Sequence, residues 1–380
     1  MMKKRIIAVI LIIVMAISFT GCIFGNRQRE DAGSLPGGAE QTDPTQDPNQ
    51  DPDGTQTDPG ADPAQSGEGG STENPNSEGG KTVEEMIAEK NKVEPEISDG
   101  EVWYGKKKDV SAYLIIGVDQ AGEAPTANSR SGGGQCDVLD LVVIDDAAKS
   151  YSILQINRDT ITGVDITDWD GEVVANIDQQ ISFAHAYSNG SASSCENVVR
   201  AVSRLLGGID IDGYCSLRYS AIPALNDALG GVSVKIEDDF SKSDPTLVQG
   251  ETVELHGEHA LRYVRGRMNV GDGSNASRMR RQRTYIAAFE AKLKQEMKGN
   301  GAVIGNLYNA AQPYMVTNLS SGTITTLANK AASYYNSGTV SPSGRYETVT
   351  YSTGATHTAF YPDADSLKGL ILQLFYTKAS

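Results

Sequence analysis

Residues 112–118 read AYLIIGV, and two further apolar runs follow at residues 138–144 (VLDLVVI) and 152–156 (SILQI). Each run is short, contains β-branched residues and is bounded by Gly, Asp or Asn. Runs of this kind are typical of strands that are buried within a domain. We therefore expect these three segments to form strands of one central β-sheet.

Helical patterns alternate with these strands along the rest of the chain. Residues 194–206 carry apolar side chains on one face, with Ser194 as the expected N-cap and Gly207 at the end. Further helices are expected at residues 220–229, 277–297 and 363–376, and further strands at 232–236 and 346–351. Interleaved strands and helices predict a single α/β domain over residues 102–380, with helices flanking a central sheet that we expect to be mixed.

The first 25 residues have the pattern of an export signal. Lys3, Lys4 and Arg5 precede a charge-free run that reaches Gly25, and Cys22 directly follows Gly21. A cysteine at this place resembles a bacterial lipobox, in which Cys22 would be acylated. The alternative is one membrane span, since residues 6–25 are long enough to cross a bilayer. Both interpretations place the domain outside the cytoplasm, anchored at the outer leaflet of the cell membrane.

Residues 26–101 are expected to form a disordered linker. Residues 31–80 contain eleven acidic residues and seven prolines but no Lys or Arg, and this region carries most of the formal net charge of -16. Such a composition cannot bury enough apolar surface to offset its chain entropy. The acidity of the chain therefore belongs to a tether and does not describe the ligands of the folded domain.

The cysteines and histidines do not predict a zinc site. Cys136, Cys195 and Cys215 remain once Cys22 is set aside, and no pair of them has metal-ligand spacing. The segment from His256 to His259 lacks the order of a zinc-binding helix. A disulfide between Cys195 and Cys215 and three buried thiols are both compatible with the sequence.

Arginines are concentrated in one part of the chain. Seven of them fall within residues 262–283, at positions 262, 265, 267, 278, 280, 281 and 283. Arg265 and Arg267 would share a face of an extended segment, and Arg278 and Gln282 would share a face of a helix. A solvated basic surface is the simplest explanation, but guanidinium groups grip phosphate in a fork that lysine cannot reproduce. We therefore favour an anion site.

Carboxylates stand at the ends of the expected strands. Asp119 follows the first strand, Asp137 begins the second after a Gly-rich loop, and Asp159 follows Arg158 beyond the third. A single Asp at the end of a strand is more often a turn residue or a helix cap than a metal ligand. Together with the arginines, they favour a magnesium–phosphate centre, because Mg²⁺ is usually held by one or two carboxylates plus phosphate oxygens.

Six segments in order resemble the LytR–CpsA–Psr family of envelope-attachment proteins. The resemblance covers residues 113–289 and extends toward residue 376. The segments are LIIGVD (114–119), CDVLDLVVID (136–145), INRDT (156–160), DALGGVSV (227–234), LHGEHALRYVRGR (255–267) and SRMRRQR (277–283).

The resemblance implies an outward-facing phosphotransferase. It would move an anionic glycopolymer, such as teichoic acid or capsule, from a polyprenyl-diphosphate carrier to peptidoglycan, with the lipid tail in an apolar tunnel. Asp119 and Asp137 match the family's ligands for Mg²⁺, with Mn²⁺ as an alternative. The diphosphate-binding residues that match are Arg158, Arg265, Arg267, Arg278 and Gln282.

The sequence departs from the family pattern in places, and it leaves other functions open. Gln135 stands where the family usually has an arginine, and Arg130 is a candidate replacement. We assign Arg158, Arg265 and Arg267 to catalysis, with Asp159 as the proton acceptor. The same residues could serve a polyprenyl-diphosphate hydrolase or a polyanion-binding lipoprotein without activity. A nucleic-acid partner is not expected outside the cell.

Overall fold

A computed structural model describes residues 96–380, with gaps at 126–131, 169, 298–301, 351–355 and 380. The expected signal segment, Cys22 and Arg130 lie outside the described residues. Strand β1 (Ile97–Ser98) pairs with β2 (Trp103–Lys106), and β15 (Tyr376–Lys378) pairs with the other edge of β2. The predicted domain began at residue 102, but pairing with β2 brings residues 97 and 98 into the folded part.

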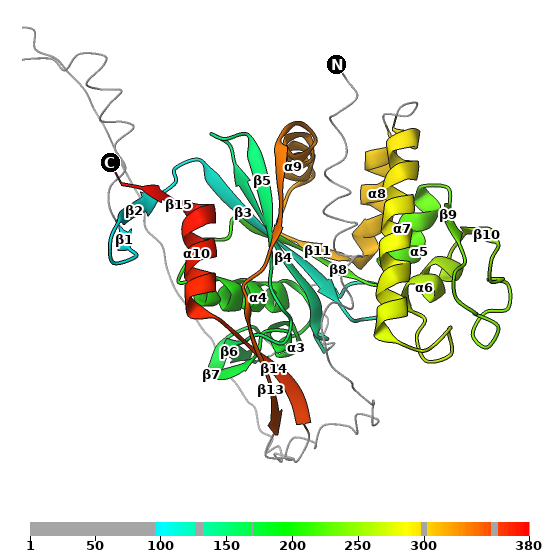
Figure 1. Cartoon of the computed structure of the whole chain (residues 1–380), viewed down its shortest axis with the longest axis horizontal. Helices are drawn as coiled ribbons and strands as arrows, with labels where there is room; N and C mark the ends of the chain where they lie inside the picture. The colour runs from blue at the N-terminus through cyan, green and yellow to red at the C-terminus, as the bar shows by residue number, and fades with distance from the viewer. Residues whose placement is uncertain (1–95, 126–131, 169, 298–301, 351–355, 380) are drawn as a thin grey trace, which may run out of the picture. The chain divides into compact units, whose positions relative to one another are not determined.

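A six-stranded mixed sheet forms the centre of the domain (Figure 1). Its order is β11-β8-β3-β4-β5-β12, with β3 parallel to β8, β5 parallel to β12 and the other pairs antiparallel. The strands are β3 (Val110–Val118), β4 (Cys136–Asp145), β5 (Ser150–Gln155), β8 (Gly213–Arg218), β11 (Met315–Thr317) and β12 (Tyr335–Val340). The expectation of a central mixed sheet with flanking helices is confirmed.

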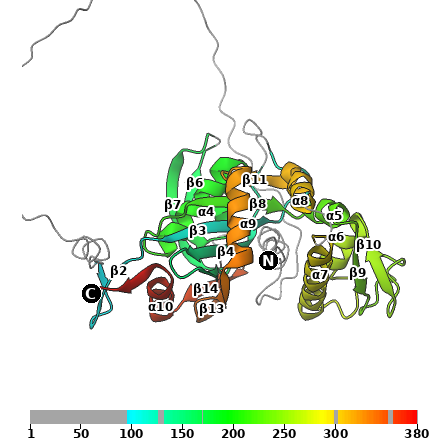
Figure 2. The same ribbon diagram turned by 90° about the horizontal axis from the view of Figure 1, so that it is seen from above.

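Helices cover both faces of this sheet because its strands are apolar on both sides (Figures 1 and 2). Ile115 and Leu217 face one cluster, which includes side chains from α5 (Ala221–Ala228), α6 (Glu258–Arg265), α7 (Asn275–Glu296), α8 (Val303–Ala311) and α9 (Ser321–Ser333). Leu114 and Ile116 face the other cluster, with side chains from α3 (Phe183–Ala186), α4 (Ala192–Leu205) and α10 (Ala364–Phe375).

Among the described residues, three two-stranded antiparallel sheets also lie outside the central sheet. They are β6 (Ile161–Thr167) with β7 (Val173–Gln180), β9 (Val232–Lys235) with β10 (Thr252–Leu255), and β13 (Gly344–Thr350) with β14 (Thr356–Pro362). A short 3-10 helix, η1 (Gln312–Tyr314), precedes β11. The hairpin of β13 and β14 is important for the site, because Phe360 N donates to Asp159 O at 2.8 Å.

Most predicted elements are present, with small shifts at their ends. The helix expected at residues 194–206 is α4, but its N-cap is Ser191 and not Ser194. Ser194 is fully buried inside the helix, and its hydroxyl accepts a hydrogen bond from Gly190 N at 2.7 Å. The serine that fits the N-cap pattern in sequence therefore supports the preceding loop instead.

The three cysteines of the domain are buried free thiols. Cys136 and Cys195 lie in the cluster under α4, whereas Cys215 lies on the opposite face of the sheet. A Cys195–Cys215 disulfide is therefore absent. Burial raises the pKa of Cys136 to about 12 and that of Cys215 to about 12, so both stay protonated at neutral pH.

Candidate active site

Asp119 and Asp137 lie together at one edge of the central sheet. Val118, the last residue of β3, pairs with Cys136, the first residue of β4. Asp119 and Asp137 each follow one of these two residues in the sequence. Asp119 N also donates to Gln135 O at 3.0 Å, which ties the two chain segments together. Antiparallel pairing thus brings together two acidic residues that are 18 positions apart in the sequence.

Arg265 holds the first of these carboxylates. Its Nη2 lies 2.7 Å from Asp119 Oδ1. Its guanidinium group also stacks over the ring of Tyr219, with Cζ 3.7 Å from the ring centroid. Because β8 runs parallel to β3 with Arg218 beside Val118, Tyr219 stands next to Asp119 at the end of the sheet. The sequence does not show this parallel pairing, so Tyr219 was not predicted.

Arg158 holds the second carboxylate. One terminal nitrogen pairs with Asp137 Oδ1, and the other donates to Gln135 Oε1. Gln135 therefore helps to orient Arg158. The Nε atom of Arg158 lies 3.6 Å from Asp159 Oδ1, and the same oxygen accepts from Gln180 Nε2 at 2.7 Å. Asp159 thus makes a second ionic contact to Arg158, and Gln180 holds the Asp159 carboxylate in place.

Electrostatic coupling shows that these groups form one cluster. Burial raises the pKa of Asp137, Arg158 opposes the rise, and the nearby Asp119 carboxylate adds to it. Burial and the charge of Arg267 lower the pKa of Arg278, and Arg265 acts in the same direction. Arg278 is therefore half-buried among like charges. Such a concentration of positive charge is favourable when an anion is bound between the arginines.

Arg265 and Arg267 do not share an extended segment, the arrangement in which their spacing would place both on one face. Helix α6 includes Arg265 as its last residue, and Gly266 then turns the chain away from the helix axis. Arg267 follows in the loop, where its Nε donates to Gly273 O at 3.4 Å. The helix is stable here because α7 caps it: Arg281 Nε donates to Tyr263 O at 3.1 Å.

Gln282 takes part in the same cap. Its Nε2 donates to Val264 O at 3.3 Å, and its side chain is buried. Its predicted contact with a diphosphate stays a prediction, as do the ligand contacts of Arg158, Arg265, Arg267 and Arg278.

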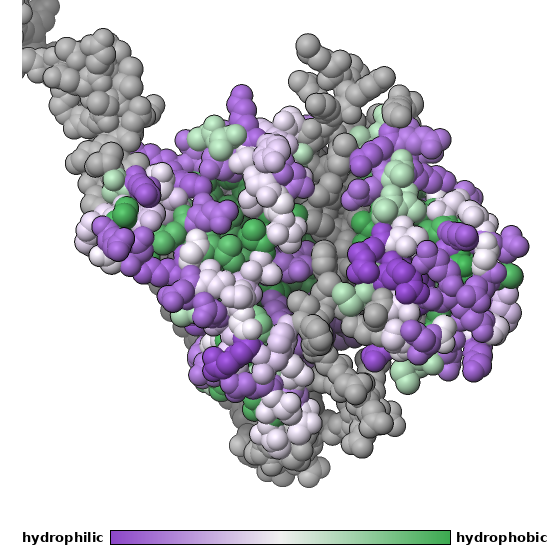
Figure 3. Space-filling view, viewed as in Figure 1, coloured by the Kyte–Doolittle hydropathy of each residue, from purple (hydrophilic) through white to green (hydrophobic). Residues whose placement is uncertain are grey.

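Three of the remaining arginines have structural partners. Arg262 pairs with Asp244 at 3.1 Å, and Arg280 pairs with Glu237 at 3.0 Å. Arg281 is fully buried and pairs with Asp238. Arg262 and Arg280 are thus held in ion pairs with acidic residues other than Asp119 and Asp137. Figure 3 shows strongly hydrophilic side chains gathered over the region of α6 and α7.

A metal at this site would rest on Asp119 and Asp137. Within the described part of the chain, no group of three or more His, Cys, Asp or Glu side chains is arranged as a metal site. The two neighbouring carboxylates match the donor set that Mg²⁺ takes when phosphate oxygens complete its coordination. The mutual repulsion seen at Asp137 would also be relieved by a cation.

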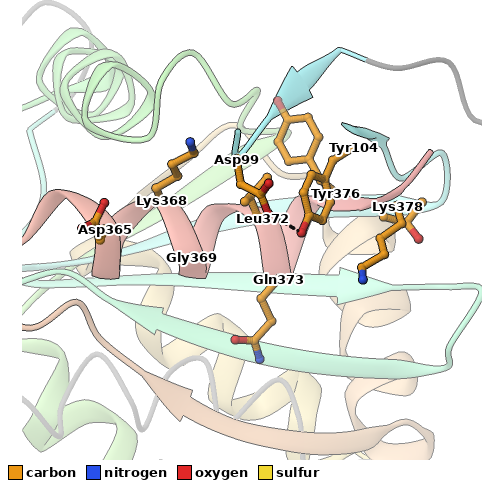
Figure 4. Close-up of a pocket in the computed structure, with 10 residues that line it drawn as sticks. Asp99, Tyr104, Asp365, Lys368, Gly369, Leu372, Gln373, Tyr376 and Lys378 are labelled. Atoms are coloured by element: carbon orange, nitrogen blue, oxygen red, sulfur yellow. Dashed lines mark hydrogen bonds between the residues drawn. The ribbon is translucent and has the colours of Figure 1, made fainter. Parts of the chain in front are cut away.

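A cavity also lies elsewhere in the domain, away from these arginines. It measures about 610 Å³ and is lined by residues of β2, α10 and β15 and by Asp99, none of them in the arginine cluster (Figure 4). In this cavity Tyr104 Oη donates to Asp99 Oδ2 at 2.8 Å, and Lys368 is the cation on the helix. No arginine lines it, so it is not part of the site formed around Asp119 and Asp137.

The model of the LytR_cpsA_psr family matches residues 74–363, which is more than half of the chain. The chain belongs to this family. The match includes all six segments that were first recognised in the sequence.

Individual relatives of the family align over part of their length. Polyisoprenyl-teichoic acid–peptidoglycan teichoic acid transferase TagU of Halalkalibacterium halodurans is 31% identical over 188 residues, covering 50% of this chain and 54% of the relative. Biofilm regulatory protein A of Streptococcus mutans is 28% identical over 208 residues, covering 50% of this chain and 47% of the relative. The chain thus spans about half the length of the curated relatives that it matches.

The fold is also found among solved structures. Protein gbs0355 of Streptococcus agalactiae aligns with a TM-score of 0.50 at 22% identity, covering 70% of this chain and 86% of that chain. This likeness concerns the fold of the LytR_cpsA_psr domain. In the described residues, no helix is both long and apolar enough to cross a bilayer.

Proposed function

We propose that this protein is an extracytoplasmic phosphotransferase that moves an anionic glycopolymer from a polyprenyl-diphosphate carrier to peptidoglycan. The observation that carries the proposal is the pair Asp119 and Asp137, each bound to an arginine at one sheet edge beside the half-buried Arg278. The teichoic acid transferase names of several relatives support the same reaction class.

In this proposal the arginines bind the diphosphate. Arg158 and Arg265 would release their carboxylate partners in part and turn their free N–H groups toward phosphate oxygens. Arg267 and Arg278 would add charge from the loop and from α7. Tyr219 holds the Arg265 guanidinium group in place, since Arg265 Cζ lies 3.7 Å from the centroid of the Tyr219 ring. A preformed set of donors of this kind stabilises charge that develops during transfer.

Asp119 and Asp137 would hold Mg²⁺ or Mn²⁺. When bound, such an ion neutralises phosphoryl charge and assists departure of the lipid phosphate. The two carboxylates fit this role because they are close enough for Asp119 to raise the pKa of Asp137. Without a cation, the arginines alone offset this repulsion.

The transfer itself makes one bond and breaks one bond. A peptidoglycan hydroxyl oxygen attacks the sugar-side phosphorus, and the bond from that phosphorus to the bridging oxygen breaks. The leaving group is the polyprenyl monophosphate, whose charge Arg158 and Arg278 would stabilise. The hydroxyl proton needs a base, and Asp159 is the predicted acceptor, held in place by Gln180.

The membrane side of the proposal concerns the lipid. The prenyl chain would lie in an apolar tunnel beside the sheet, against the cluster that includes Ile115, Val142 and Leu217. Acylation of Cys22, or one membrane span in residues 6–25, would hold the domain at the outer leaflet. Both anchors keep the domain on the side of the membrane where peptidoglycan is found.

One assay separates the proposal from its alternatives. The full chain in detergent is incubated with Mg²⁺, peptidoglycan and a prenyl-diphosphate-linked disaccharide that carries a radiolabelled sugar. We expect label on peptidoglycan and release of prenyl monophosphate. Free sugar phosphate without labelled peptidoglycan would indicate a hydrolase, and binding without turnover would indicate a polyanion-binding protein.

A further inference from the structure

The cavity of about 610 Å³ beside α10 has no part in the proposed transfer (Figure 4). It lies between α10 and the small sheet that contains β2 and β15, and we call it the α10 cavity. Cavities of about 300–1,000 Å³ commonly bind ligands, so this one is large enough. It lies at the opposite end of β3 from Asp119, because β2 precedes β3 and Asp119 follows it. A ligand here would be bound apart from the transfer centre.

The floor of the α10 cavity is a glycine in the middle of a helix. Gly369 lines the cavity, and a Cβ added there would meet nothing within 4 Å. Glycine is less favourable than alanine inside a helix, because it loses more conformational freedom on folding. No neighbouring atom requires a glycine at this place. The missing side chain leaves the helix backbone open to close approach by a ligand.

Two tyrosines form the wall opposite the helix. Lys378 pairs with Tyr104 in register, so Tyr104 and Tyr376 lie on the same face of the small sheet. Tyr104 Oη donates to Asp99 Oδ2 at 2.8 Å, which fixes its ring. Asp99 Oδ1 accepts from Val102 N at 2.8 Å, so this carboxylate is already engaged by its own segment. The wall is therefore a preformed aromatic surface, which can pack against peptide groups and short aliphatic side chains.

Three charged side chains around the cavity can bind a ligand. The side chains of Asp365 and Lys378 make no hydrogen bond or ion pair to any residue that the structure describes. Lys368 Nζ donates to Ser98 O at 3.1 Å, which leaves two of its three N–H groups for other partners. The cavity thus offers two ammonium groups and one carboxylate. The complementary ligand carries two carboxylates and one amine.

The positions of these charges indicate the length of the ligand. Asp365 and Phe375 are ten positions apart on α10, so they are separated by about 15 Å along the helix axis. An extended peptide rises about 3.3 Å per residue, so about four or five residues cover this distance. Figure 4 shows Asp365 at one end of the cavity and Lys378 at the other, with the two tyrosines between them. The ligand is therefore a short chain and not a single small ring.

Other anionic chains fit these charges less well. Asp365 would repel the repeated phosphates of a glycopolymer. The acidic tether carries no amine for Asp365, because residues 31–80 contain no Lys or Arg. A peptide that carries both signs of charge meets all of the conditions.

We infer that the α10 cavity binds the peptide stem of peptidoglycan. A stem of sequence L-Ala-γ-D-Glu-L-Lys-D-Ala, joined to the glycan through its first residue, carries two carboxylates and one amine. Lys368 and Lys378 bind the carboxylates, and Asp365 binds the amine. The inference rests on the proposed function, which makes peptidoglycan the acceptor. A wall polymer held by its peptide keeps its sugar hydroxyls at a high effective concentration near the transfer centre.

The test is calorimetry on the full chain in detergent with N-acetyl-L-Ala-γ-D-Glu-L-Lys-D-Ala as the main probe. Gly369→Gln fills the floor of the cavity with a good helix former, and Lys378→Gln removes one ammonium group. Gly305→Gln is the control for the first variant, because Gly305 is also exposed in a helix, where a Cβ meets nothing within 4 Å. Lys242→Gln is the control for the second, since Lys242 is exposed and does not line the cavity.

Both cavity variants should bind the main probe at least about tenfold more weakly than the wild type, with both controls at the wild-type value. Acetylation of the lysine amine of the probe should weaken binding to the wild type by a similar factor. It should have no effect on binding to Asp365→Asn, because Asp365 binds this amine.

The inference is overturned if the cavity variants bind the main probe as tightly as their controls do. It is also overturned if acetylation of the probe leaves wild-type affinity unchanged, or if a synthetic peptide of residues 41–60 binds as tightly as the main probe. Farnesyl diphosphate, a short analogue of the lipid carrier, reports on the arginines separately. Failure to bind it would count against the proposed function, while the stem peptide still tests the cavity.

Discussion

Arg265 makes two contacts that a lysine cannot make together. Its guanidinium pairs with Asp119 at 2.7 Å and stacks flat on Tyr219. Lysine would keep the charge but lose the planar fork and the stacking surface. Arg262 is a suitable comparison, because it lies on the same helix as Arg265 but pairs with Asp244 and not with Asp119.

Arg265→Lys is expected to weaken binding of farnesyl diphosphate about tenfold, or about 1.4 kcal/mol. Arg262→Lys should leave the affinity within about twofold of wild type, because Arg262 pairs with Asp244 and not with either carboxylate of the site. Titration of both variants by calorimetry checks this. Equal losses in the two variants would indicate a diffuse basic surface in place of a built anion site.

Asp140 should make stability depend on pH in an unusual direction. Burial raises its pKa from 3.8 to about 7, with Gln155 partly opposing the rise. The folded state therefore holds this proton more tightly than the unfolded state does. Stability falls as pH rises from about 4 to about 7, and the full cost is present above that window.

Asp140→Asn removes this cost, so its gain in stability should grow with pH and reach a few kcal/mol at pH 8, on the order of 4 at most. Thermal unfolding of both proteins between pH 4.5 and pH 8.5 measures the gain. The exposed Asp178→Asn serves as the control and should show no such trend. A gain that is constant across this range would contradict the assignment.

At the level of elements, the Gly-rich loop before β4 positions Asp137 by packing closely on α3. A Cβ added at Gly133 would lie 1.8 Å from His185 O, so only glycine fits. His185 Nδ1 lies 2.5 Å from Gly133 O, and burial lowers the pKa of His185 to about 4. A neutral imidazole that donates from Nδ1 thus fastens the loop.

Gly133→Ala should therefore destabilise the domain by about 1–3 kcal/mol through overpacking. Gly132→Ala is the matched control, since a Cβ there would meet nothing within 4 Å. Differential scanning calorimetry should show a lower Tm for Gly133→Ala and an unchanged Tm for the control. Identical melting of the two variants would show that the loop adapts and does not fix Asp137.

The strands were predictable from sequence because their apolar runs are continuous. Leu114, Leu139 and Leu154 are buried in the sheet where the pattern placed them. Asp119 and Asp137 could be predicted as candidate site residues, since both stand at the ends of these apolar runs. Helix α6 was not predicted, and its carboxyl end is capped from α7 by Arg281 and Gln282. Tyr219 and Gln180 were missed for the same reason: their partners are distant in sequence and are set by the tertiary fold.

For the whole molecule, attachment to the membrane determines how the domain reaches its carrier. The predicted lipidation site at Cys22 would begin a long acidic tether at the outer leaflet. Two or three acyl chains anchor a protein stably, at about 0.8 kcal/mol per buried methylene.

Cys22→Ala should block acylation and normal signal removal, leaving an uncleaved chain held by residues 6–25. Mass spectrometry of the amino terminus from native membranes checks this. An intact Met1 peptide in the wild-type protein would show a membrane span and exclude the lipoprotein anchor.

Tracking of the transferred phosphorus tests the proposed centre most directly. A prenyl-diphosphate disaccharide labelled with ³²P only at the sugar-side phosphorus is incubated with the full chain, peptidoglycan and Mg²⁺. The label should move to peptidoglycan in the wild type, and Asp137→Asn should slow this transfer at least about 100-fold. The proposal is contradicted if the label stays on the lipid or leaves as soluble phosphate, or if Asp137→Asn transfers it at the wild-type rate.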